Sequence, residues 1–380
     1  MRTIQTRWTE KDGWKPSPPD AIADFADLVL VFGSRAALAD NSLFDAIKTA
    51  AGKALLAGCS TAGEICGTQV SDDTIVVTAV KFDSTQVAGS VTPIDNPQQS
   101  YNAGKTLGGQ LSRDGLVHVI VLSDGVHVNG SALVSGLRDH LPASVTVTGG
   151  LSGDGDRFEE THVILGGKPT SKAVAAIGFY GDALRVGYGS MGGWDPFGPE
   201  RLITKSEGNV LYELDGRSAL ALYKEYLGDH AKDLPASGLL FPLSIRSSIQ
   251  NETPVVRTIL SVDESHQSLT FAGDIPQGAY ARLMKANFDR LIDGATTAAQ
   301  RCHTPVTGAT PQLGLLISCV GRKLLLQQRI EEEIESVRDV FGPSTVLTGF
   351  YSYGEISPFT PNARCELHNQ TMTITTFNEI

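Results

Sequence analysis

A glycine-bounded loop carries the residues best suited to binding a ligand. The loop GCSTAGEI, residues 58–65, places a thiol, two hydroxyls and a carboxyl group directly after an apolar strand. Glycine lets the backbone approach a ligand closely, and clustered N–H groups and hydroxyls form a polar cradle. The alternative is a tight turn whose serine and threonine bond their own backbone. The candidate ligand-binding residues here are Cys59, Ser60, Thr61 and Glu64.

A second loop, GFYSYGEI at residues 349–356, repeats the first loop at two glycines, the glutamate and the isoleucine, which indicates duplication. We expect the two loops to face one another across a cleft between two domains, where small-molecule pockets concentrate. Facing carboxyl groups would also suit an acid and base pair, as in glycosidases, so an enzyme using Glu64 and Glu355 is an alternative. The candidates in this loop are Ser352, Tyr353 and Glu355.

Two further segments add candidates. The loop GGLSGDG, residues 149–155, lacks the G-x-G-x-x-G spacing of a dinucleotide site and contributes Asp154. The segment SCVGR, residues 318–322, ends a predicted strand and contributes Cys319 and Arg322. A guanidinium binds carboxylates and phosphates with two parallel hydrogen bonds, whereas the alternative is an arginine that solvates a helix start.

Motifs of the common enzyme classes are absent from the sequence. It has no G-x-S-x-G, H-E-x-x-H or GxxxxGK[ST], so we expect no enzymatic activity. The eight histidines show no pair at metal-ligand helical spacing, and the five cysteines show no CxxC pair. One histidine suffices to ligate haem. His368, on an alternating strand, is the candidate ligand if haem is bound, and otherwise a satisfied core histidine.

Three stretches share one layout of strand, amphipathic helix, strand and polar loop, and they span residues 28–65, 117–155 and 313–356. Short apolar strands flanked by helices predict sheets buried on both faces and parallel pairing inside each unit. Intervening hairpins make the sheets mixed. The predicted fold is therefore α/β, with two related halves of mixed, largely buried sheets flanked by helices, and with repeated β-α-β-loop units. Residues 217–300 could be a fourth, divergent copy.

The length of 380 residues favours two domains. Glycines and prolines interrupt every periodic pattern at residues 189–200, where we place the boundary. The predicted parts are an N-terminal extension at 1–25, a first domain at 26–190 and a second at 191–380.

The net charge of −11 argues against nucleic acid and anionic membrane surfaces as partners. No apolar run approaches the roughly 20 residues of a membrane-spanning helix. The N-terminus is polar and interrupted by prolines, unlike a signal peptide. We therefore expect a cytoplasmic protein with reduced cysteines.

These motifs resemble the FIST family. GCSTAGEI is similar to the signature of its N-terminal domain, and SCVGR, GFYSYGEISP and LHNQTMTI to those of its C-terminal domain. GGLSGDG and LYELDGRSALALYKEYLG, residues 211–228, also fit, so the resemblance covers roughly residues 26–377. It implies a sensory protein of signal transduction that binds a small ligand, with amino acids among the proposed ligands.

The resemblance also bears on partners. Some members built from these two domains alone are haem-binding nitric oxide sensors that regulate a separately encoded histidine kinase or cyclic-di-GMP enzyme. By this resemblance we expect a separate signalling partner, although the family's motifs identify no haem ligand here. A remaining alternative is an interaction scaffold that exposes Glu331, Glu332 and Glu333 on the acidic helix RIEEEIESVRD.

Overall fold

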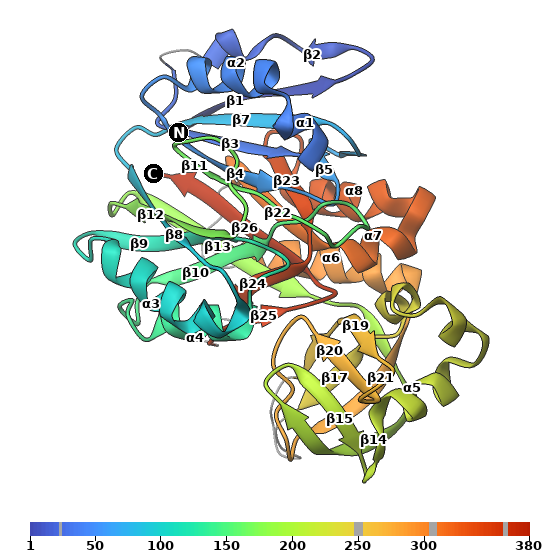
Figure 1. Cartoon of the computed structure of the whole chain (residues 1–380). Helices are drawn as coiled ribbons and strands as arrows, with labels where there is room; N and C mark the ends of the chain where they lie inside the picture. Colours follow the sequence, from blue (N-terminus) through green and yellow to red (C-terminus); the bar gives the residue numbers. More distant parts are fainter. Residues whose placement is uncertain (23–24, 247–253, 304–309, 360–363) are drawn as a thin grey trace.

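The structure is a computed structural model that describes residues 1–22, 25–246, 254–303, 310–359 and 364–380. The strands in these ranges form three mixed six-stranded sheets and one eight-stranded antiparallel sheet (Figure 1). Helices flank the three mixed sheets, so the predicted α/β class is confirmed. No helix in the described ranges is both long and apolar enough to cross a membrane.

The first sheet grows from the first repeated unit. Every residue of β3 (Leu28–Gly33) is buried, as its continuous apolar sequence predicts, and β3 pairs in parallel with β4 (Leu55–Ser60). Asp40 caps α2 (Asn41–Ala51), which buries Phe44 and Ile47 at helical spacing. The sheet order is β11-β4-β3-β7-β1-β2. The remaining elements are β1 (Arg2–Thr9), β2 (Gly13–Lys15), β7 (Ile75–Lys81), β11 (Val163–Leu165) and α1 (Arg35–Ala39).

The second sheet has the order β25-β24-β10-β9-β12-β8, and β9 and β10 are its parallel pair. Helices α3 and α4 pack against each other on this sheet. Its elements are β8 (Gln86–Pro93), α3 (Ser100–Gln110), β9 (Leu116–Ser123), α4 (Gly130–Arg138), β10 (Thr146–Leu151), β12 (Ala173–Tyr180), β24 (Gly354–Pro358) and β25 (Cys365–His368).

The third sheet has the order β13-β26-β22-β23-β5-β6, and β22 and β23 are its parallel pair. Strand β13 begins before the predicted boundary at residues 189–200 and runs into it, yet it pairs with β26 at the end of the chain. Its elements are β5 (Glu64–Cys66), β6 (Gln69–Ser71), β13 (Leu184–Met191), α6 (Phe288–His303), β22 (Leu313–Cys319), α7 (Val320–Leu326), α8 (Ile330–Phe341), β23 (Val346–Ser352) and β26 (Met372–Glu379).

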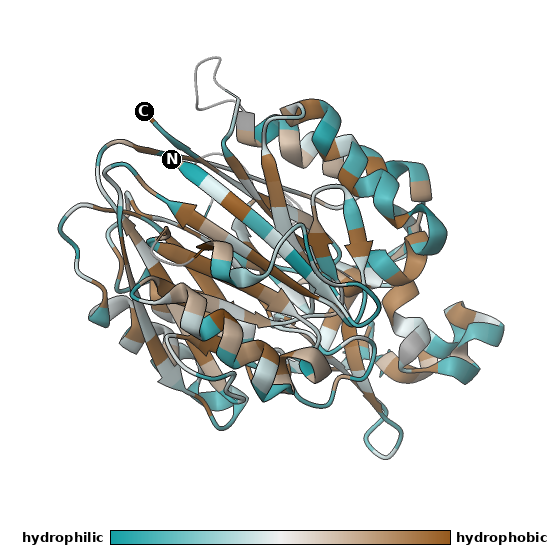
Figure 2. Ribbon diagram, turned by 90° about the horizontal axis from the view of Figure 1, so that it is seen from above, coloured by the Kyte–Doolittle hydropathy of each residue, from teal (hydrophilic) through white to brown (hydrophobic). Residues whose placement is uncertain are grey.

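The three sheets exchange strands in a cycle. Hairpin β5–β6 at the end of the first unit joins the third sheet, and hairpin β24–β25 at the end of the third unit joins the second sheet. Strand β11, which follows the second unit, joins the first sheet. One central core collects inward-facing side chains from all three sheets, and the Phe32 and Phe350 rings lie 4.8 Å apart in it. Figure 2 shows the strands as largely hydrophobic and the surrounding helices as mixed. The repeated units are therefore interlocked.

The described strands between residues 194 and 286 form the fourth sheet, and their pairs are all antiparallel. The expected fourth copy of the repeat is therefore wrong, because that repeat requires a parallel pair. This sheet packs around its own core with α5 and projects away from the other three (Figure 1). Its main elements are β14 (Trp194–Glu207), β15 (Val210–Leu214), α5 (Ala219–Leu227), β17 (Leu243–Arg246), β20 (Ser268–Phe271) and β21 (Tyr280–Ala286).

Candidate functional site

Three polar turns, one from each repeated unit, meet after folding. We name them turn 1 (residues 60–63), turn 2 (151–155) and turn 3 (351–353). Backbone hydrogen bonds join all three: Ala62 N donates to Tyr351 O at 2.8 Å, Gly153 N to Ser60 O at 2.9 Å, and Tyr353 N to Leu151 O at 3.1 Å. The convergence of the duplicated loops is therefore observed, and turn 2 completes the junction.

Glu64 joins turn 1 to the start of strand β7. Its carboxyl group is fully buried and accepts hydrogen bonds from the Thr61 hydroxyl, the Thr74 hydroxyl at 2.7 Å and the Thr74 amide at 3.1 Å. Burial raises the pKa of Glu64 to about 7, although these hydrogen bonds act in the opposite direction. The side chain is therefore held by turn 1 and by the residue directly before β7.

Glu355 repeats this arrangement in the third unit. It is buried and accepts hydrogen bonds from the Ser352 hydroxyl at 2.6 Å, the Thr371 hydroxyl at 2.9 Å and the Thr371 amide at 3.1 Å. Burial raises the pKa of Glu355 to about 8, against the effect of these bonds. The shared sequence motif thus encodes one local structure, in which a carboxyl group fastens a turn to the following strand.

The predicted thiols and the serine of the first loop lie in the interior. Cys59 and Cys319 are buried, and burial raises the pKa of both thiols well above the usual range. The Ser60 hydroxyl accepts a hydrogen bond from the His162 amide at 2.8 Å. These three side chains support the turns and do not line the cleft described below.

Asp154 and Tyr353 connect turns 2 and 3. The Tyr353 hydroxyl donates to the buried Asp154 carboxylate and accepts from the Phe158 amide at 3.1 Å. The Asp154 carboxylate also accepts from the Phe158 amide at 3.0 Å, and the Phe158 and Tyr353 rings stack 4.1 Å apart. This contact orders the loop that follows turn 2.

We expect Tyr353→Phe to lower the free energy of unfolding by about 1–3 kcal/mol, because a buried carboxylate loses its hydroxyl donor. Urea titration followed by circular dichroism would measure the loss. Tyr101→Phe is the matched control, since the Tyr101 hydroxyl bonds Asp139 at the surface, and it should cost less than about 0.5 kcal/mol. Equal losses in the two variants would contradict this role of Tyr353.

Arg322 is a structural residue. It is fully buried and pairs with Glu333 at 2.5 Å, while it donates to Gly192 O at 2.8 Å and to Leu291 O at 2.7 Å. Its prediction as a ligand-binding cation is wrong, because α7 directs Arg322 into the protein. The expectation that Glu331, Glu332 and Glu333 together form an exposed acidic surface is wrong for Glu333, which is buried and paired with Arg322.

His368 is not arranged as a haem ligand. The ring is buried, its Nε2 bonds Ser357 O at 2.9 Å, and burial lowers its pKa to about 4. One ring nitrogen is thus engaged by the backbone, and the arrangement observed is that of a satisfied core histidine. Within the described ranges, no group of three or more histidine, cysteine or acidic residues could hold a metal ion.

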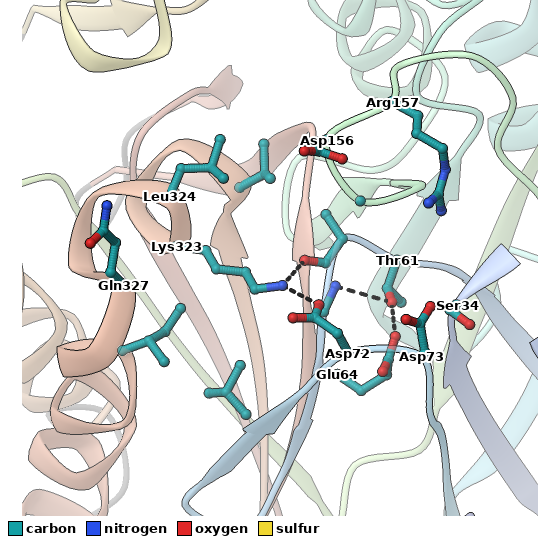
Figure 3. A pocket seen from close by; sticks show the side chains of 16 residues that line it. Ser34, Thr61, Glu64, Asp72, Asp73, Asp156, Arg157, Lys323, Leu324 and Gln327 are labelled. Carbon is teal, nitrogen blue, oxygen red and sulfur yellow. Dashed lines mark hydrogen bonds and ion pairs between the residues drawn. The ribbon is translucent and has the colours of Figure 1, made fainter. Parts of the chain in front are cut away.

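A cleft of about 580 Å³ opens beside turns 1 and 2 (Figure 3). One wall comes from turn 1, the loop before β7 and the end of turn 2. The facing wall comes from α7 and the residues after it. Of the predicted ligand-binding residues, only Thr61 and Glu64 line this cleft, and none comes from turn 3. The structure therefore does not place Glu64 and Glu355 in one cleft.

Lys323 spans the cleft from α7 to turn 1. Its ammonium group donates to Ala62 O at 2.8 Å and pairs with Asp72, as the dashed lines of Figure 3 mark. Gly63 leaves room for this approach, because a Cβ there would lie 2.8 Å from the lysine Nζ. Lys323 thus ties the third unit to the first.

The main cleft residues missed by the sequence analysis are Lys323, Asp72, Asp73 and Arg157. Lys323 directly follows the predicted Arg322, and neighbouring residues on a helix point about 100° apart. A helical projection of residues 320–326 could have suggested that only one of the two cations faces a ligand. The two aspartates precede β7 without any motif, so no comparable pattern marked them.

Comparison with known families agrees with the fold and motifs. The FIST N domain matches residues 27–217 and the FIST C domain matches residues 219–358. The chain therefore belongs to the FIST family. FIST domains are sensor domains of signal transduction that bind small ligands.

Individual proteins share about a quarter of their aligned residues with this chain. An uncharacterized protein of Methanocaldococcus jannaschii is 24% identical over 213 residues, which cover 52% of this chain and 40% of that protein. An uncharacterized protein of Mycobacterium tuberculosis is 24% identical over 246 residues, 63% of each chain. The chain thus spans less than two thirds of these relatives' length. A crystal structure of cyanuric acid hydrolase from A. caulinodans aligns over 99% of both chains at 9% identity with a TM-score of 0.35, too low to support a shared activity.

Proposed function

We propose that this chain is a sensory protein whose ligand occupies the cleft between turn 1 and α7, and that it signals through a separate partner protein without catalysing a reaction. A histidine kinase or a cyclic-di-GMP enzyme is the proposed kind of partner. The proposed location is the cytoplasm, where thiols stay reduced, and all five cysteines are free thiols.

The observation that carries the proposal is the position of the cleft between the FIST N and FIST C segments. The volume of about 580 Å³ falls within the range of about 300–1,000 Å³ typical of small-molecule pockets. Lys323 already crosses the cleft to Ala62 and Asp72. A ligand that binds one arrangement of the two walls more tightly would shift the population toward that arrangement.

The enzymatic alternative finds less support in the geometry. An acid and base pair must reach one substrate together. Glu355 does not line the cleft that contains Glu64, and each carboxyl group is engaged by a threonine near it in the chain. Haem finds no support at His368, whose Nε2 bonds Ser357 O.

The proposal predicts that filling the cleft abolishes ligand binding. We expect at least one compound of a set of small amines, carboxylates and amides to raise the melting temperature of the wild-type protein. A ligand at 100 times its dissociation constant stabilises the folded state by about 2.7 kcal/mol. Leu324→Trp should remove the shift, because Leu324 lines the cleft from α7 and the larger ring would occupy it.

Val91→Trp is the matched control, since Val91 is 48% exposed and lies outside the cleft. It should retain the ligand-induced shift. A shift that survives in Leu324→Trp, or the absence of a shift with every compound, would contradict the proposed site.

A further inference from the structure

The cleft has one acidic wall and one apolar wall, and we infer that its ligand is an aliphatic amine of net positive charge, best represented by a linear diamine. This inference rests on the proposed function and specifies its ligand. The acidic wall consists of the loop before β7, which carries Asp72 and Asp73, and of Asp156 directly after turn 2. The apolar wall is formed by Val70, Val320, Leu324 and Ile330.

Charge balance is the first support. Four carboxyl groups line the cleft, from Glu64, Asp72, Asp73 and Asp156, against two cations. With Glu64 protonated, three carboxylates still face two cations. An anionic ligand would meet this field unfavourably, whereas an ammonium group would be attracted.

The two cations are already engaged. Lys323 pairs with Asp72 and donates to Ala62 O, and the Arg157 guanidinium lies 3.9 Å from the Asp154 carboxylate. An anionic ligand would have to displace these contacts. The cleft therefore does not offer a free cation to a carboxylate or phosphate among its described residues.

The carboxylates of Asp73 and Asp156 are free to accept. Neither makes a hydrogen bond or an ion pair with any residue that the structure describes. They come from different loops, with Asp73 beside Ser34 and Thr61 and with Asp156 beside Arg157 in Figure 3. Two separated carboxylates can each receive one ammonium group, which favours a ligand with amines at both ends.

The apolar wall supplies the second requirement. Leu324 and Val320 on α7, with Ile330 and Val70, present aliphatic surface to the cleft. A methylene chain gains free energy when it contacts such a surface and leaves water. The combination of acidic and aliphatic walls thus matches a ligand whose ammonium groups are joined by methylenes.

Isothermal titration calorimetry of the full chain with 1,5-diaminopentane at low salt tests the inference, and glutarate serves as a dianion of similar length. We expect saturable binding of the diamine and none of glutarate. The double variant Asp73→Asn with Asp156→Asn should weaken diamine binding at least tenfold. Asp95→Asn with Asp114→Asn is the control, because it removes two exposed carboxylates outside the cleft and should leave affinity unchanged.

Leu324→Trp distinguishes failure of the amine inference from failure of the proposed function. Diamine binding that persists in Leu324→Trp, or that falls equally in both double variants, would show diffuse attraction to an acidic protein and overturn the inference. If the diamine does not bind but a neutral or anionic compound does, in a manner lost in Leu324→Trp, the proposed function stands and the amine inference fails. If no compound binds in a manner lost in Leu324→Trp, the function itself fails.

Discussion

Replacing Glu333 with alanine is expected to lower the free energy of unfolding by about 3–5 kcal/mol, because the substitution leaves the Arg322 guanidinium buried without its counter-ion. The Tyr351 hydroxyl, which donates to Glu333 at 2.8 Å, would lose its acceptor as well. Urea unfolding followed by circular dichroism would measure the effect. Glu333→Gln keeps one oxygen acceptor and provides a milder second variant if the alanine variant does not fold.

Glu335→Ala is the control on the same helix, because Glu335 is exposed, and its effect should stay within about 0.5 kcal/mol. The double variant Arg322→Met with Glu333→Leu removes both charges and should be less destabilised than Glu333→Ala. A loss below 1 kcal/mol for Glu333→Ala would mean that the ion pair is not buried as described.

The second prediction concerns the pH dependence of stability. The pKa values of Glu64 and Glu355 rise from the usual 4.5 to about 7 and about 8, since both groups are buried. A carboxyl group with a higher pKa in the folded protein binds its proton more tightly when folded. Its contribution to stability is fully present below pH 4.5 and is lost progressively as the pH rises from 4.5 to about 7 for Glu64 and to about 8 for Glu355.

Glutamine at both positions removes this titration. Relative to wild type, the variant Glu64→Gln with Glu355→Gln should gain stability between pH 5 and pH 7 by about 1.4 kcal/mol per pH unit for each substituted group. Urea titrations at pH 5, 6 and 7 would follow the difference. A difference independent of pH in the double variant would show that neither carboxyl group has a raised pKa.

The repeated loop motif correctly predicted how the two loops fold, but it did not predict which residues line the cleft. The match between GCSTAGEI and GFYSYGEI led to the correct expectation that the two loops converge, and Ala62 does bond Tyr351. The same match suggested that Glu64 and Glu355 share a cavity. Each carboxyl group instead bonds a threonine near it in the chain, Thr74 and Thr371 respectively. The repeated glutamate therefore reflects a repeated local hydrogen bond to a threonine, and not a shared cavity.

The candidate cleft depended on contacts that sequence patterns do not report. Lys323 and Asp72 are 251 positions apart in the chain, and they meet because β5 and β6 leave the first unit for the third sheet. Arg322 was the more conspicuous cation for binding an anion, but the rotation along α7 directs it to Glu333. Only the helix's orientation on its sheet distinguishes these two neighbours.

The sequence by itself determined the local elements and the family. Continuous apolar strands such as residues 28–32, helix faces at 3.6-residue spacing and the glycine-bounded loops follow from short-range sterics and burial, which neighbouring residues encode. The tertiary structure alone decided which strands cross between sheets and which side chains reach the cleft. The reason is that long-range pairing depends on the packing of all three sheets around one core, and no single segment contains that information.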